Sequence, residues 1–141
     1  HVLFDISPNI VLWTWEDDAL GEYLKSLLAV QELPVKTALP AHRTAGSIPL
    51  AARADELINH HQRRIEELSA IVRGWPGLTC YEVAARMKWS IRAASWDDFP
   101  PSQKYFAVCE CMAHLQHMCC SGLAERRTDA NSVMRYYAKG K

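Results

Sequence analysis

The stretch Leu39-Pro40-Ala41-His42-Arg43 divides the chain into two parts of different character. The residues before it are predicted to form a strand, a helix and a second strand, because short apolar runs flank one segment of helical periodicity. The residues after it are predicted to form a small helical domain that ends in a β-hairpin. The sequence therefore predicts two units, residues 1–50 and residues 51–141, and a mainly α fold within the α+β class.

The composition is that of an ordinary globular chain. Hydrophobic residues make up 49% and charged residues 23% of the 141 positions, and 16 basic residues balance 16 acidic ones. A nucleic-acid or membrane-surface protein usually carries a basic surplus, so neither partner is favoured by charge. No apolar run is long enough to cross a membrane. The 5 cysteines cluster late and are odd in number, which indicates reduced thiols in a cytoplasm.

The part before His42 has clear start and stop signals. Val2–Ile6 is an apolar run that predicts a buried strand, and the chain begins as if cut from a longer sequence. Three acidic residues at 16–18 favour the start of a helix, which runs to about Leu33, where Pro34 ends it. A second strand is predicted at Val35–Leu39. Two strands and one helix cannot close a core alone, so this part is expected to pack on other residues.

The part after His42 carries signals for three helices and a hairpin. Thr79 and Glu82 have the spacing of a capping box, which marks the start of a short helix. The predicted elements are helices over residues 51–73, 80–87 and 101–121, an irregular connector over residues 90–101, and strands over residues 123–128 and 133–137. This order of three helices and a two-stranded ribbon predicts a winged-helix-like domain.

Several motifs together carry a resemblance to a known family. They are His1-Val2-Leu3-Phe4-Asp5-Ile6-Ser7-Pro8-Asn9-Ile10, Leu20-Gly21-Glu22-Tyr23-Leu24-Lys25-Ser26-Leu27, Leu39-Pro40-Ala41-His42-Arg43, Thr79-Cys80-Tyr81-Glu82-Val83-Ala84 and Trp96-Asp97-Asp98-Phe99-Pro100-Pro101. The first three resemble the last part of a metallo-β-lactamase-fold hydrolase, an αββα fold. The others resemble the winged-helix domain that follows it in a bacterial branch of that superfamily.

The resemblance implies a metal site to which this chain contributes one ligand. The family binds a pair of zinc ions through a His-x-His-x-Asp-His cluster, a further His, a bridging Asp and a last His. His42 matches the last His, and His1 matches the residue after the bridging Asp. A hydrolytic zinc site needs about three protein ligands and an open position. The expectation is therefore a non-catalytic C-terminal portion of a zinc hydrolase, with two zinc ions in the intact parent and none in this chain.

Other residues that suggest metal chemistry have simpler interpretations. His60 and His61 are adjacent on a helix and face different sides, so they cannot chelate one ion. His61 falls in the apolar stripe and is expected to be a core residue. The late helix carries Cys109, Cys111, His114, His117, Cys119 and Cys120. Helical spacing predicts that its thiols fill apolar space and that its histidines face solvent, with a surface metal at His114 and His117 less favoured.

A nucleic-acid-binding winged helix is the alternative function. Arg126, Arg127 and Arg135 lie on the predicted hairpin, where a wing can contact phosphate. The late helix, which would read bases, lacks the arginines and lysines that such contacts need. The favoured role is therefore protein contact. The expected partners are the chain's own catalytic domain or a second copy of the chain, with nucleic acid less favoured and no membrane.

Overall fold

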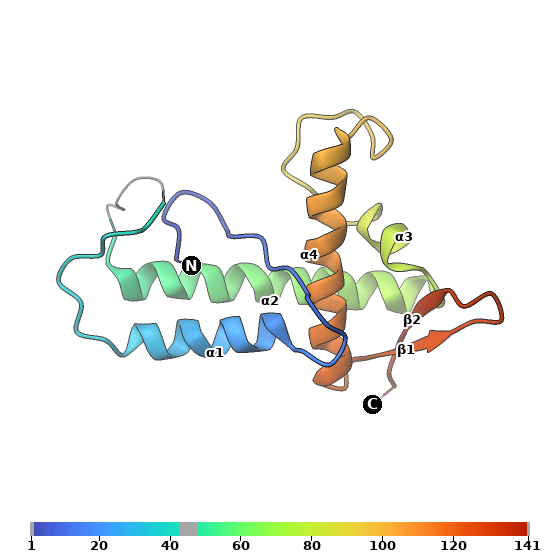
Figure 1. Ribbon diagram of the computed structural model, residues 1–141, viewed down its shortest axis with the longest axis horizontal. Helices are drawn as coiled ribbons and strands as arrows, with labels where there is room; N and C mark the ends of the chain where they lie inside the picture. Colours follow the sequence, from blue (N-terminus) through green and yellow to red (C-terminus); the bar gives the residue numbers. More distant parts are fainter. Residues whose placement is uncertain (1, 43–47, 141) are drawn as a thin grey trace.

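The computed structural model describes residues 2–42 and 48–140, and four helices precede a β-hairpin in this part of the chain (Figure 1). The elements are α1 (Ala19–Gln31), α2 (Leu50–Gly74), α3 (Cys80–Ala84), α4 (Pro101–Cys120), β1 (Ala124–Thr128) and β2 (Met134–Ala138). Helices α1 and α2 lie side by side and antiparallel, and α4 crosses α2 steeply (Figure 1). His1 and Arg43, which belong to two of the family motifs, lie outside the described residues.

Two helices, α1 and α3, begin at side-chain caps, and the α3 cap is the capping box that the sequence predicts. Asp18 caps α1, and its Oδ1 accepts a hydrogen bond from the Gly21 amide at 2.9 Å. At α3 the capping box is complete, because the Glu82 amide donates to Thr79 and the Thr79 amide donates to Glu82. Helix α3 ends at Ala84, earlier than predicted, and the Trp89 indole N–H donates to the Ala84 carbonyl at 2.8 Å. That bond satisfies a carbonyl that a longer helix would have used.

The two strands predicted before His42 do not form. Val2–Ile6 and Val35–Leu39 are irregular, and the sheet among the described residues contains β1 and β2 alone. A strand needs a ladder partner for its backbone groups. The carbonyls of Leu3 and Ile6 instead accept hydrogen bonds from the Arg53 guanidinium, at 2.6 and 2.9 Å. The first segment is thus held on α2 by a side chain. The helix of the strand-helix-strand prediction is observed as α1, and the prediction of the two strands is wrong.

Helix α1 contributes to the same core as the later helices. Leu20 is fully buried in the main cluster with Leu68 on α2 and Leu115 on α4. Leu27, further along α1, packs with Leu57 in a second cluster between α1 and α2. Burial of such a leucine contributes about 2 kcal/mol. The part before His42 therefore does pack on the helical part, through the apolar face of α1.

The hairpin anchors the turn between α2 and α3. Strands β1 and β2 are antiparallel, with Ala124 opposite Ala138. Tyr136 is 1% exposed and joins the main core, while its amide donates to the Leu78 carbonyl at 2.9 Å. The Gly77 amide in turn donates to the Tyr136 carbonyl at 2.9 Å. The predicted order of three helices and a hairpin after His42 is therefore observed in α2, α3, α4 and the β1–β2 ribbon.

Candidate functional site

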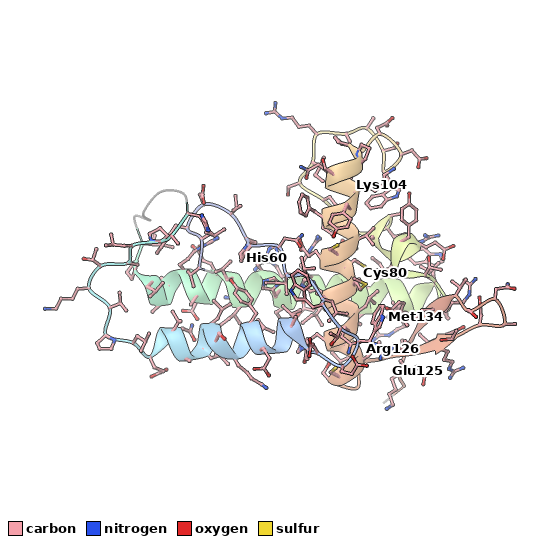
Figure 2. The ribbon with its side chains drawn as sticks, viewed as in Figure 1. His60, Cys80, Lys104, Glu125, Arg126 and Met134 are labelled. Carbon is pink, nitrogen blue, oxygen red and sulfur yellow. The ribbon has the colours of Figure 1, made fainter. Side chains whose placement is uncertain are left out.

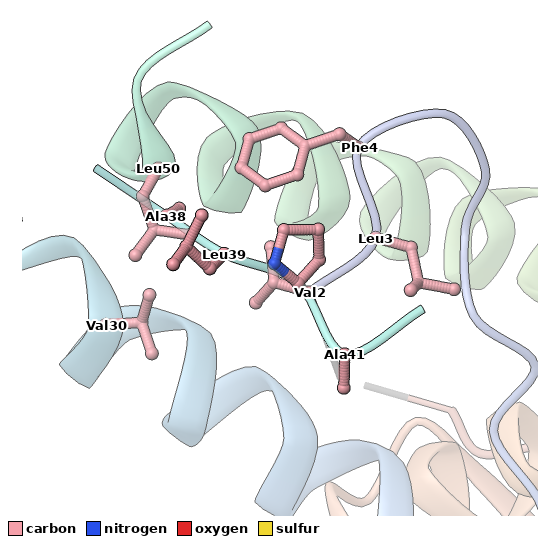
Figure 3. Close-up of a pocket in the computed structure, with 9 residues that line it drawn as sticks. Val2, Leu3, Phe4, Val30, Ala38, Leu39, Ala41 and Leu50 are labelled. Atoms are coloured by element: carbon pink, nitrogen blue, oxygen red, sulfur yellow. The ribbon is translucent and has the colours of Figure 1, made fainter. Parts of the chain in front are cut away.

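An apolar hollow lies at residues 38–41, directly before His42 in the sequence (Figure 3). The hollow has a volume of about 290 Å³ and is lined by Val2, Leu3, Phe4, Val30, Ala38, Leu39, Pro40, Ala41 and Leu50. Leu39 is 85% exposed, although it is a large aliphatic side chain. His42 follows directly on the lining residue Ala41 and is itself exposed. Exposed apolar surface of this kind is typical of a contact site.

The described residues do not complete a zinc site around His42. No group of three or more His, Cys, Asp or Glu side chains that could hold a metal ion occurs within residues 2–42 and 48–140. A zinc centre requires such a group. The donor set of this part of the chain therefore does not fit the metal pair of the family, and the assignment of His42 as one ligand of the parent site stays a prediction.

A buried histidine pair joins α2 to α4. Nδ1 of His61 lies 3.0 Å from Nε2 of His114, and Nδ1 of His114 lies 2.7 Å from the Glu110 carbonyl oxygen. Both side chains are 0% exposed. Because a carbonyl only accepts, Nδ1 of His114 carries a proton. In the neutral ring Nε2 then accepts from the protonated Nδ1 of His61, which leaves Nε2 of His61 as a bare lone pair.

Burial fixes the charge state of this pair. Desolvation, and next the field of His114, lower the pKa of His61 to about 3. Desolvation lowers the pKa of His114 to about 4 against the opposing hydrogen bond to Glu110. The Tyr23 ring of α1 packs edge-on against His61 with centroids 5.6 Å apart, and burial raises the pKa of Tyr23 to about 12. All three groups are neutral at pH 7, and among the described residues Nε2 of His61 has no hydrogen-bond partner.

The segment before α1 covers the face of α4 that was predicted to be open. His117 Nδ1 lies 3.0 Å from the Asp18 carboxylate, and the Gln116 side-chain amide donates to the Trp15 carbonyl at 2.7 Å. The prediction that His114 faces solvent is wrong, because α2 and this segment enclose α4 from two sides. A DNA-reading helix needs an exposed face. The corresponding face of α4 is occupied by the chain itself.

The three wing arginines all have partners within the chain. Arg126 lies in the middle of β1 (Figure 2). It donates a hydrogen bond to the Gln116 side chain, and its guanidinium lies 5.2 Å from the Trp15 ring centroid. Arg135 donates to the Asp129 carboxylate at 2.6 Å and to the Gly77 carbonyl at 3.0 Å. Arg127 pairs with Glu125 and stacks on Tyr137. These contacts are structural, and nucleic-acid binding through the hairpin stays a prediction.

The cysteines of α4 mostly fill apolar space, as predicted. Cys111 is 0% and Cys109 6% exposed, and Cys111 belongs to the main core cluster. Burial raises the pKa of the Cys111 thiol well above its ordinary value, which makes it unreactive. All five cysteines are free thiols. Among the described residues, no helix is long and apolar enough to cross a membrane.

Comparison with known proteins shows which proteins this chain is similar to. The family model described as the metallo-beta-lactamase-like C-terminal domain matches residues 97–139. A beta-lactamase domain protein from Burkholderia ambifaria superposes with a TM-score of 0.76 at 24% identity, over 94% of this chain and 38% of that protein. A metallo-beta-lactamase family protein from Thermus thermophilus superposes with a TM-score of 0.75 at 27% identity, over 98% of this chain and 40% of that protein. No match is found among the curated proteins.

The predicted resemblance to metallo-β-lactamase family proteins is confirmed at the level of the fold, and the winged-helix assignment stays a prediction. Residues 97–139 match the model of the metallo-beta-lactamase-like C-terminal domain, and the fold as a whole is similar to those of the two solved proteins. The matched residues contain all of α4 and the hairpin, the elements that hold His114 and the wing arginines. The chain spans about 40% of the length of each of the two solved proteins.

Proposed function

We propose that this chain is the non-catalytic C-terminal portion of a metal-dependent hydrolase of the metallo-β-lactamase superfamily. In this proposal it acts as a protein-contact domain, and its partner is the catalytic domain of the same protein. The winged-helix-like part, residues 51–141, would present residues 1–50 to that domain. The proposal places two zinc ions in the intact protein, with His42 as one ligand, and places the protein in a cytoplasm, where five free thiols persist.

The apolar hollow beside His42 is the observation that carries the proposal. A hollow of about 290 Å³ with apolar walls, one of them a leucine that is 85% exposed, is unfavourable in water. The two solved proteins of the same fold are more than twice as long as this chain, so each has further polypeptide available to pack against this fold. Docking of a catalytic domain would cover Leu39 and fix the His42 loop at the same time. The buried histidine pair, by contrast, has no access from solvent and offers no catalytic group.

A fusion protein tests the docking. The part of the Thermus thermophilus protein that this chain does not match would be joined to this chain, and the melting temperature measured for the fusion and for the chain alone. Leu39→Asp should leave the free chain unchanged, because that side chain is already exposed, and should lower the melting temperature of the fusion by several degrees. Leu28→Asp is the matched control, since Leu28 is 54% exposed on α1 and does not line the hollow.

Metal analysis tests the other half of the proposal. The purified chain, dialysed against a weak chelator, should retain far less than one zinc per molecule and should show no metal-dependent hydrolysis of phosphodiesters or esters. Two tightly held zinc ions in the chain alone would contradict a non-catalytic role. Equal effects of Leu39→Asp and Leu28→Asp in the fusion would contradict docking at the hollow. The alternative of a nucleic-acid-binding domain gains no support from the hairpin, since all three arginines have partners within the chain.

A further inference from the structure

A polar groove runs along α2 beneath the N-terminal segment, separate from the apolar hollow. Two adjoining cavities, of about 470 and 340 Å³, share Ser7 and His60 as lining residues. The larger one extends toward residues 88–90 of the connector after α3, and the smaller one follows α2 back toward Arg53. His60 therefore lies where the two cavities meet, on the side of α2 that faces the N-terminal segment (Figure 2).

Arg64 is held in place for an incoming ligand. Its Nη1 donates to the Lys88 carbonyl at 2.7 Å and to Glu67 at 2.9 Å, and its Nε points to Glu110 at 3.4 Å. The guanidinium lies 4.2 Å from the Trp89 ring centroid. No residue within the described ranges accepts a hydrogen bond from its Nη2. A guanidinium fixed on three sides presents that remaining group with little loss of side-chain entropy on binding.

The lining of the groove carries four cationic side chains, Arg53, Arg63, Arg64 and Lys88, against three carboxylates. The carboxylates of Glu56 and Glu110 are paired with Arg53 and Arg64, respectively. Arg63 is exposed on α2, and in the described part of the chain it has no ion-pair partner. Asp5 is the third acid of the lining, and Glu67, outside the lining, also pairs with Arg64.

The cationic side chains affect the pKa of His60. Burial, followed by the charges of Arg64, Arg63 and Arg53, lowers the pKa of His60, and no carboxylate opposes them. His60 is thus neutral at pH 7 and keeps one ring N–H as a donor. A neutral donor between cationic groups is suited to an anion, because it adds a hydrogen bond without further charge repulsion among the side chains.

We propose that this groove binds a phosphate-bearing small molecule of about mononucleotide size, with Arg63, Nη2 of Arg64 and His60 around the phosphate. The size follows from the two joined cavities, which fall in the usual range for small-ligand sites. The chemical class follows from two arginines and a neutral donor, since guanidinium groups match phosphate oxygens. The inference concerns this chain alone and does not depend on the proposed docking of a catalytic domain.

Titration of the full chain with AMP, inorganic phosphate and adenosine tests the inference. Isothermal calorimetry in low salt should detect AMP and phosphate, and AMP should bind at least fivefold more tightly than adenosine. Arg63→Gln should weaken AMP binding about fivefold or more, because the side chain is exposed and its loss leaves the fold intact. Arg73→Gln, also exposed on α2 but outside both cavities, is the matched control and should change affinity less than twofold.

The outcomes separate the components of the site. Amide shifts in an NMR titration should centre on His60, Arg64 and Trp89, and rising salt should weaken binding. Phosphate binding without any gain from the nucleoside would limit the site to the free anion and overturn the mononucleotide size. Equal affinity for AMP and adenosine, or equal effects of Arg63→Gln and Arg73→Gln, would overturn the site itself. Absence of binding by AMP at 10 mM, on the order of the weakest useful affinity, would do the same.

Discussion

Acidification should destabilise this fold through the His61–His114 pair at pH values above the ordinary range of carboxyl groups. In the folded chain the pKa values of these rings are about 3 and about 4, because burial disfavours the imidazolium form. In the unfolded chain both titrate near 6.5. The unfolded state therefore binds more protons as pH falls below 6.5, and the stability present above that pH is lost progressively toward pH 4.

The expected loss follows from the pH interval. A pH of 5 is about 1.5 units below the pKa that each ring has in the unfolded chain, whereas both rings remain neutral in the folded chain. Each ring therefore contributes about 2 kcal/mol of destabilisation relative to pH 7.5. The pair together gives roughly 4 kcal/mol, a large share of the stability of a small domain. The direction for His60, whose pKa is also lowered, is the same. Urea denaturation followed by circular dichroism at pH 7.5, 6 and 5 measures the loss directly.

A substitution at one ring separates this mechanism from general acid effects. His114→Gln removes one titrating group but keeps a donor and an acceptor, so the difference in stability between pH 7.5 and pH 5 should shrink by about 2 kcal/mol whatever the variant costs at pH 7.5. A free energy of unfolding that varies by less than 1 kcal/mol across this interval would refute the assignment of two buried neutral histidines.

Three further predictions concern stability and thiol access. Thr79→Ala removes the α3 capping box and should cost about 1 kcal/mol in urea unfolding. Leu68→Ala opens a cavity in the main core, where the side chain is 0% exposed, and should cost about 3 kcal/mol and lower the melting temperature by 10 °C or more. In the native chain, a thiol reagent should modify the exposed Cys120 within minutes, whereas Cys111 should react only on unfolding, as mass spectrometry of digests would show.

Local signals in the sequence were sufficient for the helices and the hairpin. The acidic run before α1, the Thr79–Glu82 box and the apolar stripe of α2 depend on residues within a few positions of one another, and the structure confirms all three. The strands at Val2–Ile6 and Val35–Leu39 depend on distant partners instead. An apolar run indicates burial but does not say whether a strand lies beside it. Among the described residues the Arg53 guanidinium takes the place of that strand.

The candidate sites divide in the same way. His42 was found through a motif, and its exposure beside an apolar hollow agrees with a contact loop. The groove at His60 was missed because its walls come from residues 5–7, α2 and residues 88–90, which no local pattern relates. A stripe of three arginines and a histidine on α2 would have been the signal, because Arg53, His60, Arg63 and Arg64 lie within about three turns of one another.

The burial of His114 shows why helical periodicity failed at α4. Helical spacing of apolar residues predicts one buried face. In the structure α4 is packed by α2 on one side and by the segment before α1 on another. Polar residues on the second face then have to be satisfied inside the protein, and His114, Gln116 and His117 each find a partner outside α4. The polar face of α4 that suggested a solvent-exposed recognition helix is therefore a contact surface, which joins the residues before His42 to the helices after it. These contacts fix the N-terminal segment in place. A fixed segment is the condition for the residues before His42 to present a defined surface to the proposed catalytic domain.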